Sequence, residues 1–333
     1  MTRIGIPGAL LYYQYFPAWK TFFENLGAEV VVTPPTTRNM LAEGSARVVA
    51  DTCLPVKVFL GHVLSLVDEC DYVFIPAVRS VQEKVFNCSK FLGLPDMTRA
   101  VIPESPPILE VDIDINRGKG ELYRSIYRMG RYLTRNPIKI RKAGMDAWQK
   151  HLDYREFMAR NKLSPPVAIE KMTALPETVQ EKDTGQPVSP ESTIALIGHP
   201  YLLYDEYINH RIIDRLKRAG HRVVTPEMLA GHELESAINR LTGKAYWTYE
   251  DEVVGAGGHY LQNGADGVIG IMAFGCGPDS LMMDVVRRQA TVPGSIPFMC
   301  LAVDEHTAEA GIVTRLEAFI DMMQRGEKAK ICV

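Results

Sequence analysis

Apolar residues in the first part of the chain fall into short runs that alternate with helix-like segments. Residues 3–7 predict a strand, residues 15–26 an amphipathic helix closed by Gly27, and residues 29–32 a second strand. A further apolar run at residues 72–77 predicts another strand. Runs without polar alternation are typical of parallel strands covered on both faces. This part of the chain therefore predicts a parallel α/β sheet.

The second half restarts the pattern, with a strand at residues 193–197 and a helix at residues 207–219. At a fixed offset the halves match in pairs: Pro7 with Pro200, Leu10 with Leu203, Gly27 with Gly220, and Val30-Val31 with Val223-Val224. A register kept over a whole β-α-β unit indicates two similar domains. We expect an α/β fold with two similar Rossmann-like, doubly wound domains, residues 1–110 and 191–333, and ligands in the cleft between them.

The region between these domains has a different composition. From Arg117 to Lys162 there are 13 Lys or Arg and 4 acidic residues on a helical pattern. This predicts a basic helical insertion and linker over residues 111–190, with residues 175–190 as an exposed linker. The basic face is either solvated and packed over the sheets, or a docking surface for an acidic partner or coenzyme phosphates.

Overall composition narrows the class of protein. The formal net charge is −3 over 333 residues, so no general charge points to nucleic acid or a membrane surface. No apolar run approaches the ~20 residues of a spanning helix, and the start of the chain does not look like a signal peptide. We expect a cytoplasmic protein. Six cysteines in a reducing compartment leave metal binding, redox chemistry or packing as their roles.

Two cysteines occupy matching contexts. The buried strand at residues 268–274 is followed by Cys276, then by a helix that begins near Pro278 and could be capped by Asp279 or Ser280. Cys53 also stands two residues before a helix-opening proline. A thiolate at a helix N-terminus is stabilised by backbone N–H groups and the helix dipole. The pair indicates thiolates aimed at a shared point, or two buried apolar cysteines.

A third cysteine, Cys88, is predicted in a loop after the fourth strand of the first half, at the same sheet edge as Cys53. Cys70, Cys300 and Cys332, at a strand start, inside a strand and on the tail, are interpreted as structural or incidental. Thiolates from separate loops suit zinc or an iron–sulfur cluster. No Cys-x-x-Cys run is present. Zinc would need a fourth ligand, for which His199 is a candidate, whereas a cubane cluster can keep one iron open for substrate.

Three further residues follow strands of the second half: His199, Tyr201 and His306. Each is a candidate acid, base or hydrogen-bonding group for catalysis, or a loop or capping residue. No Gly-x-x-x-x-Gly-Lys-Ser/Thr loop is present, and the glycines at residues 255–258 do not follow a predicted strand. The sequence gives poor evidence for a nucleotide site.

Several segments from residue 3 to about residue 323 together resemble one family. They are residues 4–7 with 10–13, Cys53-Leu54-Pro55-Val56-Lys57, Cys88 with residues 91–96, Gly198-His199-Pro200-Tyr201, residues 274–279, and Asp304-Glu305-His306-Thr307. The set resembles the acyl-CoA dehydratase activase-related family. That family is akin to the iron–sulfur subunits of 2-hydroxyacyl-CoA dehydratases and to double-cubane cluster proteins.

The resemblance implies a [4Fe-4S] cluster held by Cys53, Cys88 and Cys276 between two Rossmann-like domains. It also implies a separate ATP-dependent activator that delivers low-potential electrons, under anaerobic conditions. Two departures from the family pattern stand out: we expect no fused activator domain of the kind that long relatives carry, and none of the remaining cysteines can be assigned to a double cubane.

Two functions follow from this resemblance. One is an iron–sulfur reductase or dehydratase-type enzyme component, which performs a one-electron reduction or dehydration of a small substrate such as an acyl-CoA. The other is a cluster or electron carrier without substrate turnover. A zinc-stabilised structural protein is the third hypothesis. We expect no nucleic-acid or membrane partner, and a homodimer is compatible with the sequence.

Overall fold

The computed structural model describes residues 1–173, 190, 192–292, 294–325 and 330–332. The chain divides into two compact units, residues 1–155 with 246–248, and residues 156–245 with 249–333. Each unit is described by itself below. The predicted boundaries at residues 110 and 190 stay predictions, and the predicted linker lies outside the described residues except for Pro190.

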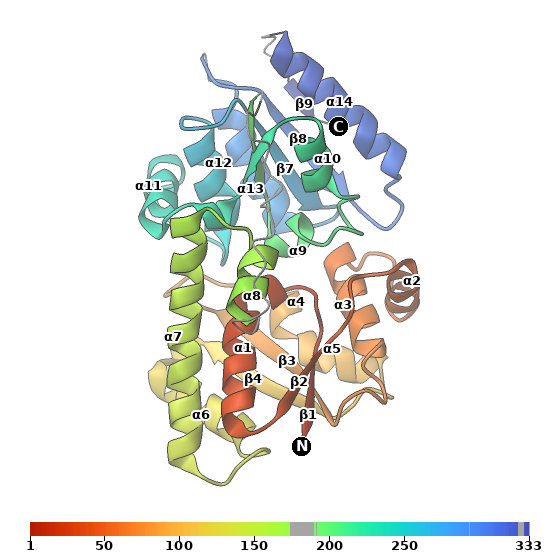
Figure 1. Cartoon of the computed structure of the whole chain (residues 1–333), viewed down its shortest axis with the longest axis vertical. Coiled ribbons are helices and arrows are strands. Elements are labelled where there is room, and N and C mark those ends of the chain that lie inside the picture. The colour runs from red at the N-terminus through yellow and green to blue at the C-terminus, as the bar shows by residue number, and fades with distance from the viewer. Residues whose placement is uncertain (174–189, 191, 293, 326–329, 333) are drawn as a thin grey trace. The chain divides into compact units, whose positions relative to one another are not determined.

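The first unit is a parallel sheet with helices between its strands (Figure 1). Its elements are β1 (Arg3–Ile6), α1 (Tyr12–Leu26), β2 (Glu29–Val32), α2 (Arg38–Ala46), α3 (Leu54–Leu64), β3 (Tyr72–Ser80), α4 (Ser89–Leu92), α5 (Leu94–Val101), β4 (Ile108–Asp114), η1 (Ile115–Arg117), α6 (Lys119–Gly130) and α7 (Pro137–Asn161). The strand order is β2-β1-β3-β4. Successive residues Val73, Phe74 and Ile75 are all buried, so both faces of β3 are covered.

The basic segment forms the helices predicted for it, and α7 packs on α1 within the first unit. The Tyr154 hydroxyl donates to the backbone oxygen of Tyr13 at 2.8 Å, and the Lys139 ammonium donates to the backbone oxygen of Leu26 at 3.2 Å. The rings of Tyr15 and His151 stack at 4.9 Å. These contacts tie the insertion to α1 of the first unit.

Helices α2 and α3 approach each other through a glycine pair. A Cβ built on Gly61 would lie 2.0 Å from the backbone oxygen of Met40, and one on Gly44 would lie 1.9 Å from that of Lys57. Real Cβ atoms cannot approach backbone so closely, so both positions require glycine. Cys53 immediately precedes α3, so the contact that positions α3 also positions Cys53.

We expect Gly61→Ala to destabilise the protein by about 1–3 kcal/mol or more, because overpacking forces backbone shifts. Chemical denaturation measures this loss. Gly120→Ala is the matched control, since Gly120 also lies in a helix but a Cβ there meets nothing within 4 Å. The control should be neutral or stabilising by up to about 1 kcal/mol. Equal stability of the two variants would contradict the close contact.

A buried histidine connects α3 to the carboxyl ends of β1 and β2. The Gly8 amide donates to Thr33 Oγ1 at 2.8 Å, so the Thr33 hydroxyl can donate its own proton to His62 Nδ1 at 2.5 Å. His62 Nε2 then carries the proton and bonds Thr36 Oγ1 at 2.9 Å. Burial lowers the pKa of His62 to about 4, which keeps this ring neutral.

The second unit repeats the architecture of the first. Its elements are α8 (Pro165–Thr173), β5 (Thr193–Ile197), α9 (Pro200–Leu203), α10 (Ile212–Arg218), β6 (Arg222–Val224), η2 (Pro226–Met228), α11 (Gly231–Leu241), η3 (Glu250–Glu252), α12 (Val254–Tyr260), β7 (Gly267–Ala273), α13 (Gly277–Gln289), β8 (Phe298–Val303), α14 (Glu309–Gln324) and β9 (Lys330–Cys332). The parallel order β6-β5-β7-β8-β9 begins as the first sheet does, with the second strand, then the first, then the third. The two Rossmann-like α/β folds predicted from the repeat are therefore confirmed.

Two details differ from the sequence predictions. The helix expected at residues 207–219 begins only at Ile212, because His210 and Arg211 have positive φ angles that interrupt a right-handed helix. Cys88 follows β3, which is the third strand and not the fourth. In the described part of the chain, no helix is long and apolar enough to cross a membrane.

Candidate functional site

The three candidate cysteines occupy the same local position in their units. Cys53, Cys88 and Cys276 are the N-cap residues of α3, α4 and α13, each with extended backbone angles, and each is half-buried. The Lys90 amide lies 3.4 Å from the Cys88 sulfur, so a backbone N–H already faces this thiol. Helix N-termini favour negative charge. All three positions therefore suit a thiolate that remains within reach of a ligand.

Cys70 and Cys300 have other surroundings. A Cβ on Gly5 would lie 2.6 Å from the Cys70 sulfur, which shows how tightly this thiol packs against β1. Burial raises the pKa of the Cys70 thiol, which disfavours the thiolate. Cys300 is buried inside β8. The side chain of Cys332, at the end of β9, lies outside the described residues. The assignment of ligand roles among these cysteines stays a prediction.

His199 lies between two carboxyl groups in the second unit. Its Nδ1 is 2.6 Å from Glu252 Oε2 and its Nε2 is 2.9 Å from Asp279 Oδ1. Burial alone would lower the pKa of His199, but the charges of Asp279 and Glu252 and their hydrogen bonds raise it well above its usual value. The ring is thus an imidazolium at neutral pH. Both ring nitrogens are engaged by carboxyl groups, and the role of His199 as a fourth zinc ligand stays a prediction.

The sheet topology positions this group. His199 follows β5, and Asp279 belongs to the first turn of α13 after β7. These two neighbouring strands flank the point where the strand order reverses, which is where open α/β sheets bind ligands. Gly198 makes the turn, because its φ is +148° and a Cβ there would lie 2.6 Å from the backbone oxygen of Ile271.

Asp279 does not cap α13, in contrast to one of the two predictions for this helix. It is 1% exposed, its Oδ1 faces His199, and its Oδ2 has no hydrogen-bond partner. Ser280, the other predicted cap, donates its hydroxyl to the backbone oxygen of Cys276 at 2.7 Å. The N-terminus of α13 has no side-chain cap. The charge of His199 explains why Asp279 turns into the protein.

A third acid of this region, Glu227, was not found from the sequence; the residue is half-buried and its Oε1 is buried. The Tyr204 hydroxyl lies 2.6 Å from Glu227 Oε2 and 2.8 Å from Thr225 Oγ1. Burial raises the pKa of Glu227 to about 7, with the Tyr204 hydrogen bond opposing and the charge of Glu252 adding to the rise. Only the Pro226 turn after β6 could have drawn attention to this position. Glu227 can therefore exchange a proton near neutral pH.

The other two candidate catalytic residues have different positions. The Tyr201 ring stacks on His199 at 5.2 Å and is mostly buried. His306 has an 85% exposed side chain, 3.9 Å from Glu305, and its amide donates to Asp304 Oδ1 at 2.9 Å. Within the described residues no contact joins His306 to His199 or Tyr201. Only His199 and Tyr201 are brought together, and the catalytic roles stay predictions.

The arrangement can hold and move protons. An imidazolium between two carboxyl groups and an acid that titrates near neutral pH lie at the carboxyl ends of adjacent strands. Glu227, whose pKa is displaced toward neutrality, is suited to general acid–base catalysis, whereas the raised pKa of His199 keeps its proton in place. Among the described residues of each unit, no group of three or more His, Cys, Asp or Glu side chains has an arrangement that could hold a metal ion.

Comparison with known proteins gives one family. No curated protein matches the chain. The family model described as "CoA enzyme activase uncharacterised domain" matches residues 3–229, about two thirds of the chain. The match covers Cys53, Cys88, His199 and Tyr201, whereas Cys276 and His306 lie beyond it. The chain therefore belongs to the family of the CoA enzyme activase uncharacterised domain.

Proposed function

We propose that this protein is a [4Fe-4S] component related to 2-hydroxyacyl-CoA dehydratases, with Cys53, Cys88 and Cys276 as its cluster ligands. The observation that carries the proposal is that these three cysteines are all half-buried helix N-caps, whereas Cys70 and Cys300 are packed against or within strands. Membership of the family of the CoA enzyme activase uncharacterised domain supports a link to CoA-dependent enzymes.

The donor set fits such a cluster. Iron–sulfur clusters are held by cysteine thiolates, and their potential depends on hydrogen bonds and solvent access around the sulfurs. Helix N-termini offer backbone N–H groups to thiolate sulfur, as the Lys90 amide does for Cys88. When bound, the cluster would supply one-electron transfer at low potential and a Lewis-acidic iron.

The chain's own residues would handle protons and orientation. Glu227, with a pKa near 7, can donate or accept a proton at its buried carboxyl group. His199 holds Asp279 and Glu252 in place, and Tyr201 covers one face of the imidazole. A dehydration needs a proton for the departing hydroxyl group, and these residues are the candidates for supplying it.

Electrons would come from a separate ATP-dependent activator, as the family resemblance implies. The sequence contains no Gly-x-x-x-x-Gly-Lys-Ser/Thr phosphate loop, which accords with a separate activator. The substrate would be a small molecule such as an acyl-CoA.

The alternative, a cluster or electron carrier without turnover, differs in one testable respect. A carrier has no reason to respond to added substrates.

The test is metal analysis of protein purified without oxygen. We expect about four iron and four sulfide per chain and little zinc, together with an EPR signal on reduction that changes when acyl-CoA thioesters are added. Stoichiometric zinc without sulfide would refute the cluster. A normal cluster signal that is indifferent to every added thioester would reassign the protein as a carrier.

A further inference from the structure

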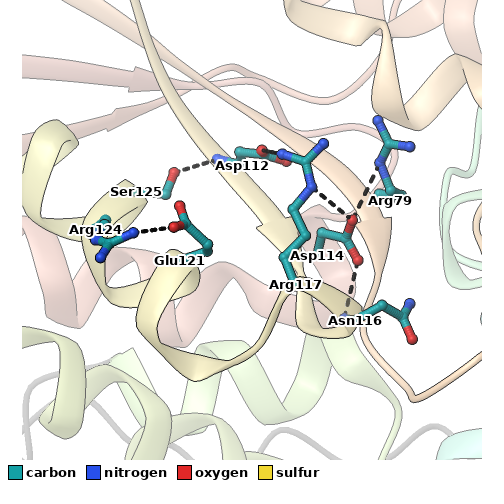
Figure 2. Close-up of polar contacts among 8 residues, drawn as sticks. All are labelled: Arg79, Asp112, Asp114, Asn116, Arg117, Glu121, Arg124 and Ser125. Atoms are coloured by element: carbon teal, nitrogen blue, oxygen red, sulfur yellow. Dashed lines mark hydrogen bonds and ion pairs between the residues drawn. The ribbon is translucent and has the colours of Figure 1, made fainter.

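A group of arginines and carboxylates lies at the carboxyl ends of β3 and β4 in the first unit. Figure 2 shows Arg79 and Arg117 converging on Asp114. The Nε atoms of both arginines lie 3.4 Å from the same oxygen, Asp114 Oδ2. The two Nε atoms are therefore within about twice that distance of each other. One carboxylate thus gathers two positive charges in a small space.

Asp114 is well placed for this anchoring role. Only 6% of it is exposed, and its other oxygen accepts the Asn116 amide at 3.1 Å. Arg117 has a second partner, since its Nη1 lies 3.3 Å from Asp112 Oδ2. The Asn116 amide thus holds one oxygen of the buried Asp114 carboxylate, and the other oxygen holds both guanidinium groups at their Nε atoms.

Arg79 retains donor capacity that its protein partner does not use. A guanidinium has five N–H donors in a planar fork. The Nε of Arg79 is buried without a hydrogen bond, and its side chain has no other ion pair or hydrogen bond among the described residues. The side chain is 39% exposed, so the outer edge of the fork is reachable. That edge matches the oxygens of a phosphate or carboxylate.

The backbone at Arg79 is irregular in a way that orients the side chain. The pairing of β3 with β4 shifts register between Val78 and Ser80, which leaves Arg79 as the extra residue. Such bulges redirect side chains and occur often beside functional sites. The Arg79 carbonyl also accepts the Asn87 amide at 2.7 Å. Arg79 therefore also holds the backbone of Asn87, the residue directly before Cys88.

We propose that Arg79 and Arg117 form a binding site for an oxyanion group, a phosphate or a carboxylate, carried by a small ligand. The anion would lie across the outer edges of the two guanidinium groups, and Asp114 would position both. Phosphate is favoured over carboxylate, because its higher charge and larger number of oxygens suit two arginines. This site extends the proposed function to ligand binding but requires no metal.

The test is binding of inorganic pyrophosphate, phosphate and succinate to the metal-free full-length protein by calorimetry, at ionic strength held constant with chloride. We expect pyrophosphate or phosphate to bind more tightly than succinate. Arg79→Gln should weaken phosphate binding about 10- to 100-fold, as expected for losing hydrogen bonds to a charged group. Arg79→Lys should also weaken it, because lysine keeps the charge but lacks the fork.

Arg124→Gln is the matched control. Arg124, labelled in Figure 2, belongs to α6, is 74% exposed and is paired with Glu121. Its replacement should leave the affinity unchanged. Tighter binding of succinate than of phosphate would keep the site but assign it to carboxylates. Failure of the wild type to bind any of the three anions, or equal loss in Arg124→Gln, would overturn the proposal. Neither result depends on whether a cluster is present.

Discussion

Cys276→Ser is expected to abolish cluster binding, with iron and sulfide falling to background and the EPR signal disappearing. Serine keeps the shape of the residue but replaces a soft thiolate with a hydroxyl group, which is a poor iron ligand. The half-buried N-cap position should tolerate this change structurally. We therefore expect the unfolding midpoint of the metal-free protein to remain near that of the wild type. Anaerobic reconstitution followed by iron and sulfide analysis measures the effect.

The matched control is Cys70→Ser, because Cys70 is also half-buried but packs against Gly5 at the start of a strand. It should retain full iron content. Cys53→Ser and Cys88→Ser should behave as Cys276→Ser does. Full iron content in Cys276→Ser, or iron loss in Cys70→Ser alone, would show that the ligands have been assigned wrongly.

His199→Leu is expected to destabilise the protein by about 3–5 kcal/mol at neutral pH, the usual cost of removing one partner from a buried charged group. Leucine would leave Glu252 and Asp279 buried without their shared partner. Chemical denaturation of both proteins measures the difference. His306→Leu is the control, and its 85% exposed side chain predicts a change within about 0.5 kcal/mol.

The pH dependence tests the charge on His199. Because its pKa is raised in the folded protein, His199 binds its proton more tightly there than in the unfolded chain. Its contribution to the free energy of unfolding is complete below the unfolded pKa of about 6.5 and is lost as pH rises through the folded pKa. The His199→Leu variant should lack this alkaline decline.

A compensating variant separates charge from packing. Adding Glu252→Gln and Asp279→Asn to His199→Leu removes the two buried charges that His199 balances in the wild type, so part of the lost stability should return. A single His199→Leu variant as stable as the wild type at pH 7 would contradict the role of the imidazolium. A triple variant no better than the single one would assign the loss to packing instead.

Local patterns were sufficient to predict the architecture. The apolar strand β7 and the helix α1, which ends at a glycine, can each be predicted from their own residues. Strand burial and helix ends depend on residues that are near in sequence. The matched offsets between halves predicted two similar sheets, and both have the same order of their first three strands. The nearby prolines also predicted that Cys53 and Cys276 stand directly before helices, although the structure alone made them the N-cap residues. The apolar runs, closing glycines and prolines each lie within a few residues of the element that they predict.

Only the tertiary structure decided which polar groups meet. Glu252 is 53 residues from His199, and Asp279 is 80 residues away, so no local spacing could join them. Asp279 was predicted as a helix cap because its sequence position permits that role; a buried imidazolium bound it instead. The same applies to Arg79, whose redirected side chain depends on the pairing of β3 with β4. The sequence determines helices and strands through preferences of neighbouring residues. Buried charged groups instead find their partners among residues that the fold brings together, because an unpaired charge costs most free energy in the protein interior.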